Sequence, residues 1–118
     1  METTRKRILV IDDESPMRQL YEEILVRRYI PTICSSGEEA LQRFRPGLFD
    51  LVLTDRDLGN GKMDGVGLLA ALRKSGYRGP AIMVSGHPKP PQEFDGRYLQ
   101  KPCNISDLYQ TIDDLLQR

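Results

Sequence analysis

Polar side chains follow several short strand-like runs of this sequence, each at the point where a buried strand would end. They comprise three carboxylates, a hydroxyl and an amine, carried by Asp12, Asp13, Asp55, Ser85 and Lys101. In an open parallel α/β sheet, the carboxyl ends of the strands form the crevice in which ligands bind. We therefore expect these side chains to gather at one edge of a sheet and to form a functional site.

The three carboxylates favour a metal site and phosphoryl chemistry. Carboxylates that converge within a few ångströms repel one another, and a hard divalent cation with oxygen ligands keeps them ionised at neutral pH. Mg²⁺ is the expected ion, because it accepts one or two carboxylates together with a phosphate oxygen. An Asp carboxylate can itself act as the nucleophile and form an aspartyl phosphate. The Lys101 ammonium would supply a second positive pole, and the Ser85 hydroxyl could donate to a phosphate oxygen.

The intervening segments predict the elements that position these residues. Apolar runs of four or five residues alternate with stretches of helical period, which favours a βαβα order and a parallel sheet of five strands. Pro16 suits the first position of the first helix, Glu39 can complete a capping box in the second, and Gly76 can end the third. The residues expected to cap the helices are Ser15, Ser36, Asp64 and Asn104.

Two segments carry prolines that restrict their structure. A strand is expected near Tyr29–Ile33, and Pro31 within it indicates a position at the sheet edge. Between Ser85 and Tyr98, three prolines remove backbone donors and disfavour helical backbone in the preceding residues. At most one turn of helix fits there, so the fourth helix is expected to be short or missing.

Length and composition exclude several classes of protein. At 118 residues, the chain is expected to be a single domain spanning residues 1–118. It carries 17 basic and 17 acidic residues, with no basic run beyond Arg5–Arg7, which argues against a nucleic-acid partner. The sequence has neither a signal peptide nor an apolar run long enough to cross a bilayer, so no membrane partner is expected. Cys34 and Cys103 fit free thiols in a reducing cytoplasm.

Five ordered motifs resemble those of two-component response-regulator receiver domains, the CheY-like family, over essentially the whole chain. The segments that carry the resemblance are Ile8–Glu14, Asp50–Asp55, Met63–Gly65, Ala81–Gly86 and Tyr98–Pro102. The last two are most similar to receivers of hybrid histidine kinases. The resemblance implies a single doubly wound, flavodoxin-like sheet of five parallel strands in the order 2-1-3-4-5.

The resemblance also implies a function in a phosphorelay. Asp55 would accept a phosphoryl group from a histidine kinase or a histidine phosphotransfer protein, and the domain would turn over no substrate besides its phosphodonor. Mg²⁺ would be held by Asp13, Asp55 and the backbone carbonyl of Asp57, while Asp12 would act mainly through a metal-bound water. The downstream protein stays unknown.

Three further residues take roles from the same resemblance. Lys101 would pair with the phosphate, and Ser85 and Tyr98 would move together as a conformational switch. Simple packing is the alternative for Tyr98. The Lys101–Pro102 peptide bond is expected to be cis.

The sequence departs from the family pattern in two loops. Gly59 stands where the family usually has a proline, and Asn60–Lys62 lengthens the loop after Asp55. Ser85 and Lys101 are closer in sequence than is common in the family, which places the shortening in the fourth-helix region. His87 in that region is expected to be structural or solvated, with a role in dephosphorylation as the alternative. The Asp57 carboxylate could orient water or simply be solvated.

Two other functions compete with the receiver interpretation. Thr54–Asp57 also resembles the nucleophile motif of haloacid-dehalogenase-type phosphatases, but those enzymes carry the nucleophile on the first strand of a larger domain, and Asp55 is expected on the third strand. A receiver-like binding module that acts without phosphorylation is the other alternative, suggested by the altered loop and the short fourth helix. The complete set of five site residues argues against it.

Overall fold

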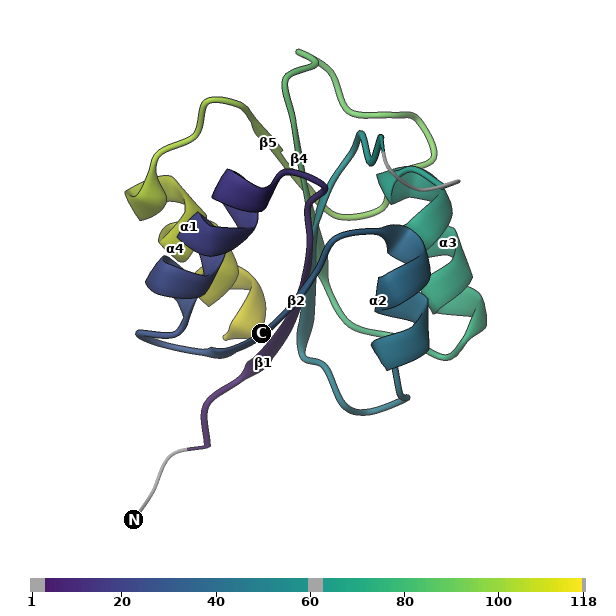
Figure 1. Cartoon of the computed structure of the whole chain (residues 1–118), viewed down its shortest axis with the longest axis horizontal. Coiled ribbons are helices and arrows are strands. Elements are labelled where there is room, and N and C mark those ends of the chain that lie inside the picture. Colours follow the sequence, from purple (N-terminus) through teal and green to yellow (C-terminus); the bar gives the residue numbers. More distant parts are fainter. Residues whose placement is uncertain (1–3, 60–62, 118) are drawn as a thin grey trace.

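Five parallel strands form one sheet in the order β2-β1-β3-β4-β5 (Figure 1). The computed structural model describes residues 4–59 and 63–117. The strands are β1 Arg7–Ile11, β2 Ile30–Cys34, β3 Leu51–Asp55, β4 Ala81–Ser85 and β5 Arg97–Gln100. Their order and parallel pairing confirm the fold class predicted from the sequence.

Helices cover both faces of the sheet, so alternate side chains of each central strand enter two separate cores (Figure 1). In β1, Ile8 and Val10 face one core, whereas Leu9 and Ile11 face the other. No helix in the described part of the chain is long and apolar enough to cross a membrane. α1 Ser15–Leu25 and α4 Ile105–Leu116 cover the face that carries Ile8 and Val10. α2 Gly37–Arg43 and α3 Gly65–Lys74 cover the face that carries Leu9 and Ile11.

The outer strands are less buried than the central ones. β2 and β5 form the two edges of the sheet and are only partly covered. Pro31 lies in β2, which confirms the predicted edge position, because a proline cannot donate to a neighbouring strand. The strand begins one residue later than predicted, since the backbone N–H of Tyr29 still donates to Leu25 at the end of α1.

Three of the four predicted helix caps are confirmed. Ser36, Asp64 and Asn104 each accept a hydrogen bond from the backbone N–H three residues further on, at 3.1, 2.8 and 2.7 Å. The capping box of α2 closes one residue earlier than expected, because the Glu39 carboxylate accepts the N–H of Ser35 at 2.7 Å. These caps fix where each helix leaves the edge of the sheet that carries the polar residues.

The predicted cap of α1 at Ser15 is wrong, because Ser15 is the first residue of the helix and Glu14 is its N-cap. The carbonyl of Glu14 accepts the first helical hydrogen bond, from Arg18 N at 3.0 Å, while its own N–H donates to the Asp12 carboxylate. Asp12 therefore organises the turn into α1, and Pro16 still occupies the first turn, where no donor is needed.

The connection between β4 and β5 contains no helix, which confirms that the fourth helix of the family pattern is missing. Residues 86–96 form bends and turns instead, and Phe94 packs against the core beside α3. The predicted lengthening at Asn60–Lys62 lies outside the described residues. The Lys101–Pro102 bond is cis, as expected.

Candidate functional site

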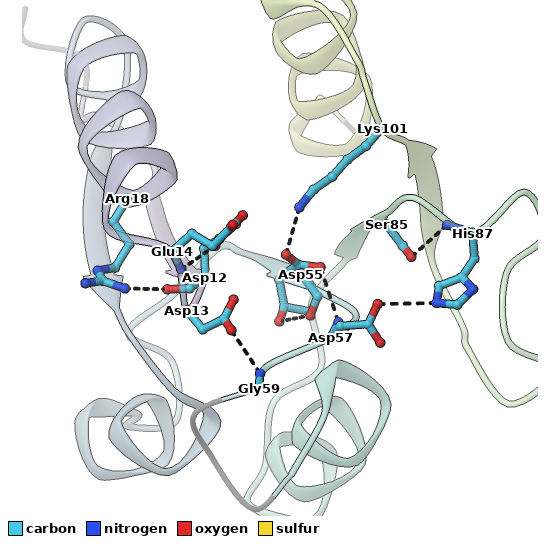
Figure 2. Close-up of polar contacts among 11 residues, drawn as sticks. Asp12, Asp13, Glu14, Arg18, Asp55, Asp57, Gly59, Ser85, His87 and Lys101 are labelled. Atoms are coloured by element: carbon cyan, nitrogen blue, oxygen red, sulfur yellow. Dashed lines mark hydrogen bonds and ion pairs between the residues drawn. The ribbon is translucent and has the colours of Figure 1, made fainter.

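The carboxyl ends of the strands bring the five predicted side chains to one edge of the sheet (Figure 2). Asp55 is the last residue of β3 and Ser85 is the last residue of β4. Ser85 pairs in register with Gln100 of β5, so Lys101 follows at the same level. Asp12 comes directly after β1, which lies beside β3. The parallel register therefore assembles a site from residues far apart in the sequence.

Asp12, Asp13 and Asp55 form an acidic cluster. One carboxylate oxygen of each residue lies within 4.8 Å of the others. Asp12 is fully buried, Asp55 is almost fully buried, and Asp13 is partly exposed. Burial, and to a smaller extent the neighbouring Asp55 carboxylate, raises the pKa of Asp12 to about 6 against the opposing hydrogen bond from the Glu14 N–H.

The acidic cluster fits a hard divalent cation. Asp12 Oδ1 accepts the Glu14 N–H at 2.9 Å, but its buried Oδ2 has no hydrogen-bond partner among the described residues. A buried carboxylate oxygen without a partner is unfavourable unless a cation, a proton or water satisfies it. All three donors are carboxylate oxygens, the ligand type that Mg²⁺ prefers. Asp12, Asp13 and Asp55 are therefore the residues that could hold the ion.

Lys101 lies on the other side of Asp55 and pairs with it directly. Its Nζ is 2.8 Å from Asp55 Oδ2. Burial alone would lower the pKa of Lys101, but the hydrogen bond and charge of Asp55, reinforced by Asp12 and Glu14, raise it above its ordinary value. Lys101 is therefore a cation held against one oxygen of Asp55, while Asp55 Oδ1 accepts the backbone N–H of Asp57 at 3.2 Å.

His87 links the remaining predicted residues. Its backbone N–H donates to Ser85 Oγ at 3.1 Å, and its backbone carbonyl accepts the Tyr98 hydroxyl at 2.7 Å. Its Nε2 lies 3.3 Å from the Asp57 carboxylate, which points away from the acidic cluster (Figure 2). His87 is exposed, as expected. It also connects the two predicted switch residues, Ser85 and Tyr98, to Asp57 in the loop after Asp55.

Three further residues, Gly59, Arg18 and Gly65, support the site, although the sequence analysis did not assign them to it. Gly59 donates its backbone N–H to Asp13 Oδ2 at 3.0 Å, and Arg18 donates to the backbone carbonyl of Asp12 at 3.0 Å. A proline at position 59 has no N–H and could not make the first contact. Gly65 lies so close to β3 that an added Cβ would stand 2.4 Å from the Asp55 carbonyl. The sequence showed the replacement of proline by Gly59 and the motif that contains Gly65, but no signal pointed to Arg18.

An apolar groove opens beside Lys101, between α1 and the start of α4. Its volume is about 450 Å³. Leu20 and Ile105, two large apolar side chains on its walls, are exposed to solvent. The other apolar side chains that line it include Met17, Ile24, Cys103 and Leu108.

Comparisons with known proteins agree with this arrangement. Residues 8–113 match the family model described as the response regulator receiver domain. The whole chain is 32% identical to a probable transcriptional regulator, ycf27, of Pyropia yezoensis, over 50% of that protein's length. The chain therefore spans about half the length of this relative.

Two solved structures share the fold and more than a quarter of the sequence. The receiver domain of the hybrid histidine kinase CckA is 27% identical, with a TM-score of 0.79, over 94% of this chain and 99% of that one. The response regulator TrrA of Thermotoga maritima, solved in complex with Mg²⁺ and BeF, is 29% identical, with a TM-score of 0.81. That match covers 94% of this chain and 99% of TrrA.

Proposed function

The chain belongs to the response regulator receiver domain family, and on this premise we propose that Asp55 is the residue that carries the phosphoryl group. The family is one of phosphoaccepting domains in two-component signalling. The observation that carries the assignment to Asp55 is its position between the acidic cluster and the Lys101 ammonium, with its carboxylate at the end of β3. Among the described residues, Asp55 is the member of the acidic cluster that forms an ion pair with Lys101.

The proposed reaction is a phosphoryl transfer from a phosphohistidine. A carboxylate oxygen of Asp55 attacks the phosphorus, the phosphorus–nitrogen bond breaks, and the departing imidazole keeps the bonding electrons and takes a proton from solvent. Hydrolysis later reverses the modification, when water attacks the phosphorus and the bond to Asp55 breaks. Apart from its phosphodonor, the domain would turn over no external substrate.

Charge neutralisation is the task of the surrounding residues. Asp13, Asp55 and the backbone carbonyl of Asp57 would hold Mg²⁺, and Asp12 would act mainly through a metal-bound water. The ion, when bound, would supply positive charge next to the phosphoryl oxygens. Lys101 would supply the second positive group, because its ammonium already lies 2.8 Å from Asp55.

Ser85 and Tyr98 would report the modification. Ser85 Oγ now accepts the N–H of His87, and a rotation toward a phosphoryl oxygen on Asp55 would remove that acceptor. Because the same residue, His87, also accepts the Tyr98 hydroxyl, a shift of its backbone would reach Tyr98. This chain of contacts supports the proposed switch.

The phosphodonor would be a cytoplasmic histidine kinase or histidine phosphotransfer protein. A partner that delivers a phosphoryl group to Asp55 must dock beside the mouth of the site. The apolar groove between α1 and α4, with exposed Leu20 and Ile105, borders Lys101 and offers a surface for that partner.

The two alternative functions are less well supported. Asp55 lies on the third strand in sequence order, unlike the first-strand nucleophile of haloacid-dehalogenase-type phosphatases. Family membership and the intact site do not favour a binding module that acts without phosphorylation.

Intact-mass measurement tests the proposal. Wild type and Asp55→Asn would be incubated with acetyl phosphate or phosphoramidate, with and without Mg²⁺. We expect one added phosphoryl group in wild type only, and only with Mg²⁺. Equal labelling of Asp55→Asn would overturn the assignment, and no labelling of wild type under any condition would support the phosphate-independent module.

A further inference from the structure

Basic residues that are scattered along the sequence gather at the edge of the sheet opposite the acidic site. Parallel strands all begin at this edge, so the segments that lead into them lie together there (Figure 1). We use the term basal surface for six exposed residues of these segments: Lys6, Arg7, Arg27, Arg45, Lys74 and Arg78. They lead into, or begin, four of the five strands.

Fewer acidic residues lie at this edge, among them Asp50 and, in the last turn of α4, Asp113 and Asp114. None of the six basal-surface side chains forms an ion pair with a carboxylate of the described residues. In that part of the chain, the arginines that form ion pairs are Arg28 and Arg43. The Asp50 carboxylate accepts the backbone N–H of Arg7. The net charge of the chain is zero, yet the carboxylates of the phosphorylation site occupy the other end of the sheet. The domain is therefore electrically polarised along its strands.

Helix stabilisation explains only part of this distribution. All four helices of the described residues end at this edge, and basic residues near a helix C-terminus are favoured by the helix dipole. This accounts for Arg27, Arg45 and Lys74. It does not account for Lys6 and Arg7, which lie at the start of β1.

Two large apolar side chains are exposed among these basic residues. Val26, next to Arg27, is 52% exposed, and Leu48, three residues after Arg45, is 38% exposed. The Arg45 guanidinium donates to the Phe44 carbonyl at 2.7 Å, and Arg5 donates to the carbonyl of Val26 at 2.8 Å. The charged groups are thus held around the ends of α1 and α2, where the aliphatic side chains protrude.

We propose that the basal surface binds the surface of an anionic lipid bilayer. Basic side chains are attracted to anionic headgroups, and exposed aliphatic side chains gain from entering the headgroup boundary. A nucleic acid would use the charges but not Val26 and Leu48. Aromatic side chains that could stack on bases are also covered here, because Tyr29 and Tyr77 are buried.

The proposed contact leaves the phosphorylation site accessible. The acidic cluster lies at the opposite ends of the same strands, so repulsion from the bilayer and attraction to the basal surface favour one orientation. In that orientation Asp55 faces away from the lipid. The sequence argued against a nucleic-acid partner because no long basic run is present, and against a membrane partner because no apolar run could cross a bilayer. The fold instead assembles the basic charge from separate segments.

Vesicle co-sedimentation of the whole chain tests the proposal. We expect binding to vesicles that contain phosphatidylglycerol, no binding to pure phosphatidylcholine, and release as salt is raised. Arg27→Gln should lower the partition coefficient about fivefold, and Lys6→Gln/Arg27→Gln/Lys74→Gln about a hundredfold. Lys89→Gln is the matched control, because it removes the same charge from the exposed loop between β4 and β5 and should have no effect.

The apolar contribution separates a bilayer from other polyanions. Val26→Ser and Leu48→Ser should each weaken vesicle binding by a factor that salt does not change, while circular dichroism shows that both variants are folded. Binding to a short DNA duplex without binding to vesicles would overturn the proposal, as would vesicle binding that falls equally in Arg27→Gln and Lys89→Gln. Asp55→Asn should bind vesicles like wild type, so this test is independent of phosphorylation.

Discussion

The ammonium of Lys101 lies 2.8 Å from Asp55 Oδ2 and joins the end of β5 to the end of β3 across β4. The two side chains form a largely buried ion pair, in which Asp55 is almost completely covered. It therefore ties three neighbouring strands together at the proposed phosphorylation site. A phosphoryl group on Asp55 would change the charge and the position of the oxygen that Lys101 meets.

Lys101→Ala should uncouple phosphorylation from the conformational response. Asp55 would still be labelled by acetyl phosphate, more slowly than in wild type, because one of two positive groups is lost. The chemical shifts of Ser85 and Tyr98 in NMR spectra should no longer change on labelling. Lys89→Ala, which removes an exposed lysine from the β4–β5 loop, serves as the control and should respond like wild type. A full spectral response in Lys101→Ala would contradict the role given to this residue.

Metal-free stability should depend on pH through Asp12. Its pKa of about 6 in the folded protein lies above the ordinary value of 3.8, so folding favours the protonated form. The folded state then binds more protons than the unfolded state between these values, and the free energy of unfolding falls as pH rises from about 4 through 6.

Asp12→Asn removes this dependence and tests it. In EDTA, the variant should be more stable than wild type by on the order of 3 kcal/mol at pH 7.5, with little difference at pH 4. Urea unfolding at several pH values provides the measurement. An advantage of Asp12→Asn that is the same at both pH values would show that ionisation of Asp12 is not its cause.

Mg²⁺ affinity should distinguish the side chain of Asp13 from that of Asp57. Asp13→Asn removes a carboxylate of the acidic cluster and should weaken Mg²⁺ binding at least about tenfold. Asp57→Asn keeps the backbone carbonyl, and its carboxylate points toward His87, so Mg²⁺ affinity should change little. Calorimetric titration of both variants decides the point, and a large loss in Asp57→Asn would place its side chain among the ligands.

Gly65→Ala should disturb the site through the backbone. The added methyl group would stand 2.4 Å from the Asp55 carbonyl and 3.1 Å from the Arg56 Cα, and neither is a flexible side-chain end. We expect a loss of about 1–3 kcal/mol in stability and slower labelling of Asp55.

Gly86→Ala is the matched control for this change. An added Cβ at Gly86 meets no atom within 4 Å, so its stability should stay within about 0.5 kcal/mol of wild type. Thermal unfolding of the two variants compares them directly. Equal stabilities of Gly65→Ala and Gly86→Ala would mean that β3 and α3 can move apart without a measurable loss in the free energy of unfolding.

The two cysteines should differ in reactivity. Cys34 is completely buried, and burial, with the nearby Glu39 carboxylate, raises its pKa to about 11. Cys103 is partly exposed. Iodoacetamide at pH 8 should therefore add one group to the folded protein and two in guanidinium chloride, as measured by mass. An adduct on folded Cys103→Ser would show that Cys34 is accessible.

The sequence by itself determined the strands, most helix caps and the candidate site. Buried strands require apolar runs, and parallel strands place their following residues at one edge, so Asp12, Asp55 and Ser85 could be assigned to the site from their positions along the chain. Prolines between β4 and β5 likewise predicted the missing helix, because they remove backbone donors. These properties depend on local chemistry and on one rule of sheet geometry.

Only the tertiary structure decided contacts between segments that are distant in sequence. The approach of Gly65 to the Asp55 carbonyl depends on how α3 packs on β3, and the links of His87 to Tyr98 and Asp57 depend on loop conformation. The gathering of basic residues on the basal surface is of the same kind. Its residues are dispersed along the chain, and the physical reason for their meeting is that all strands of a parallel sheet begin at one edge.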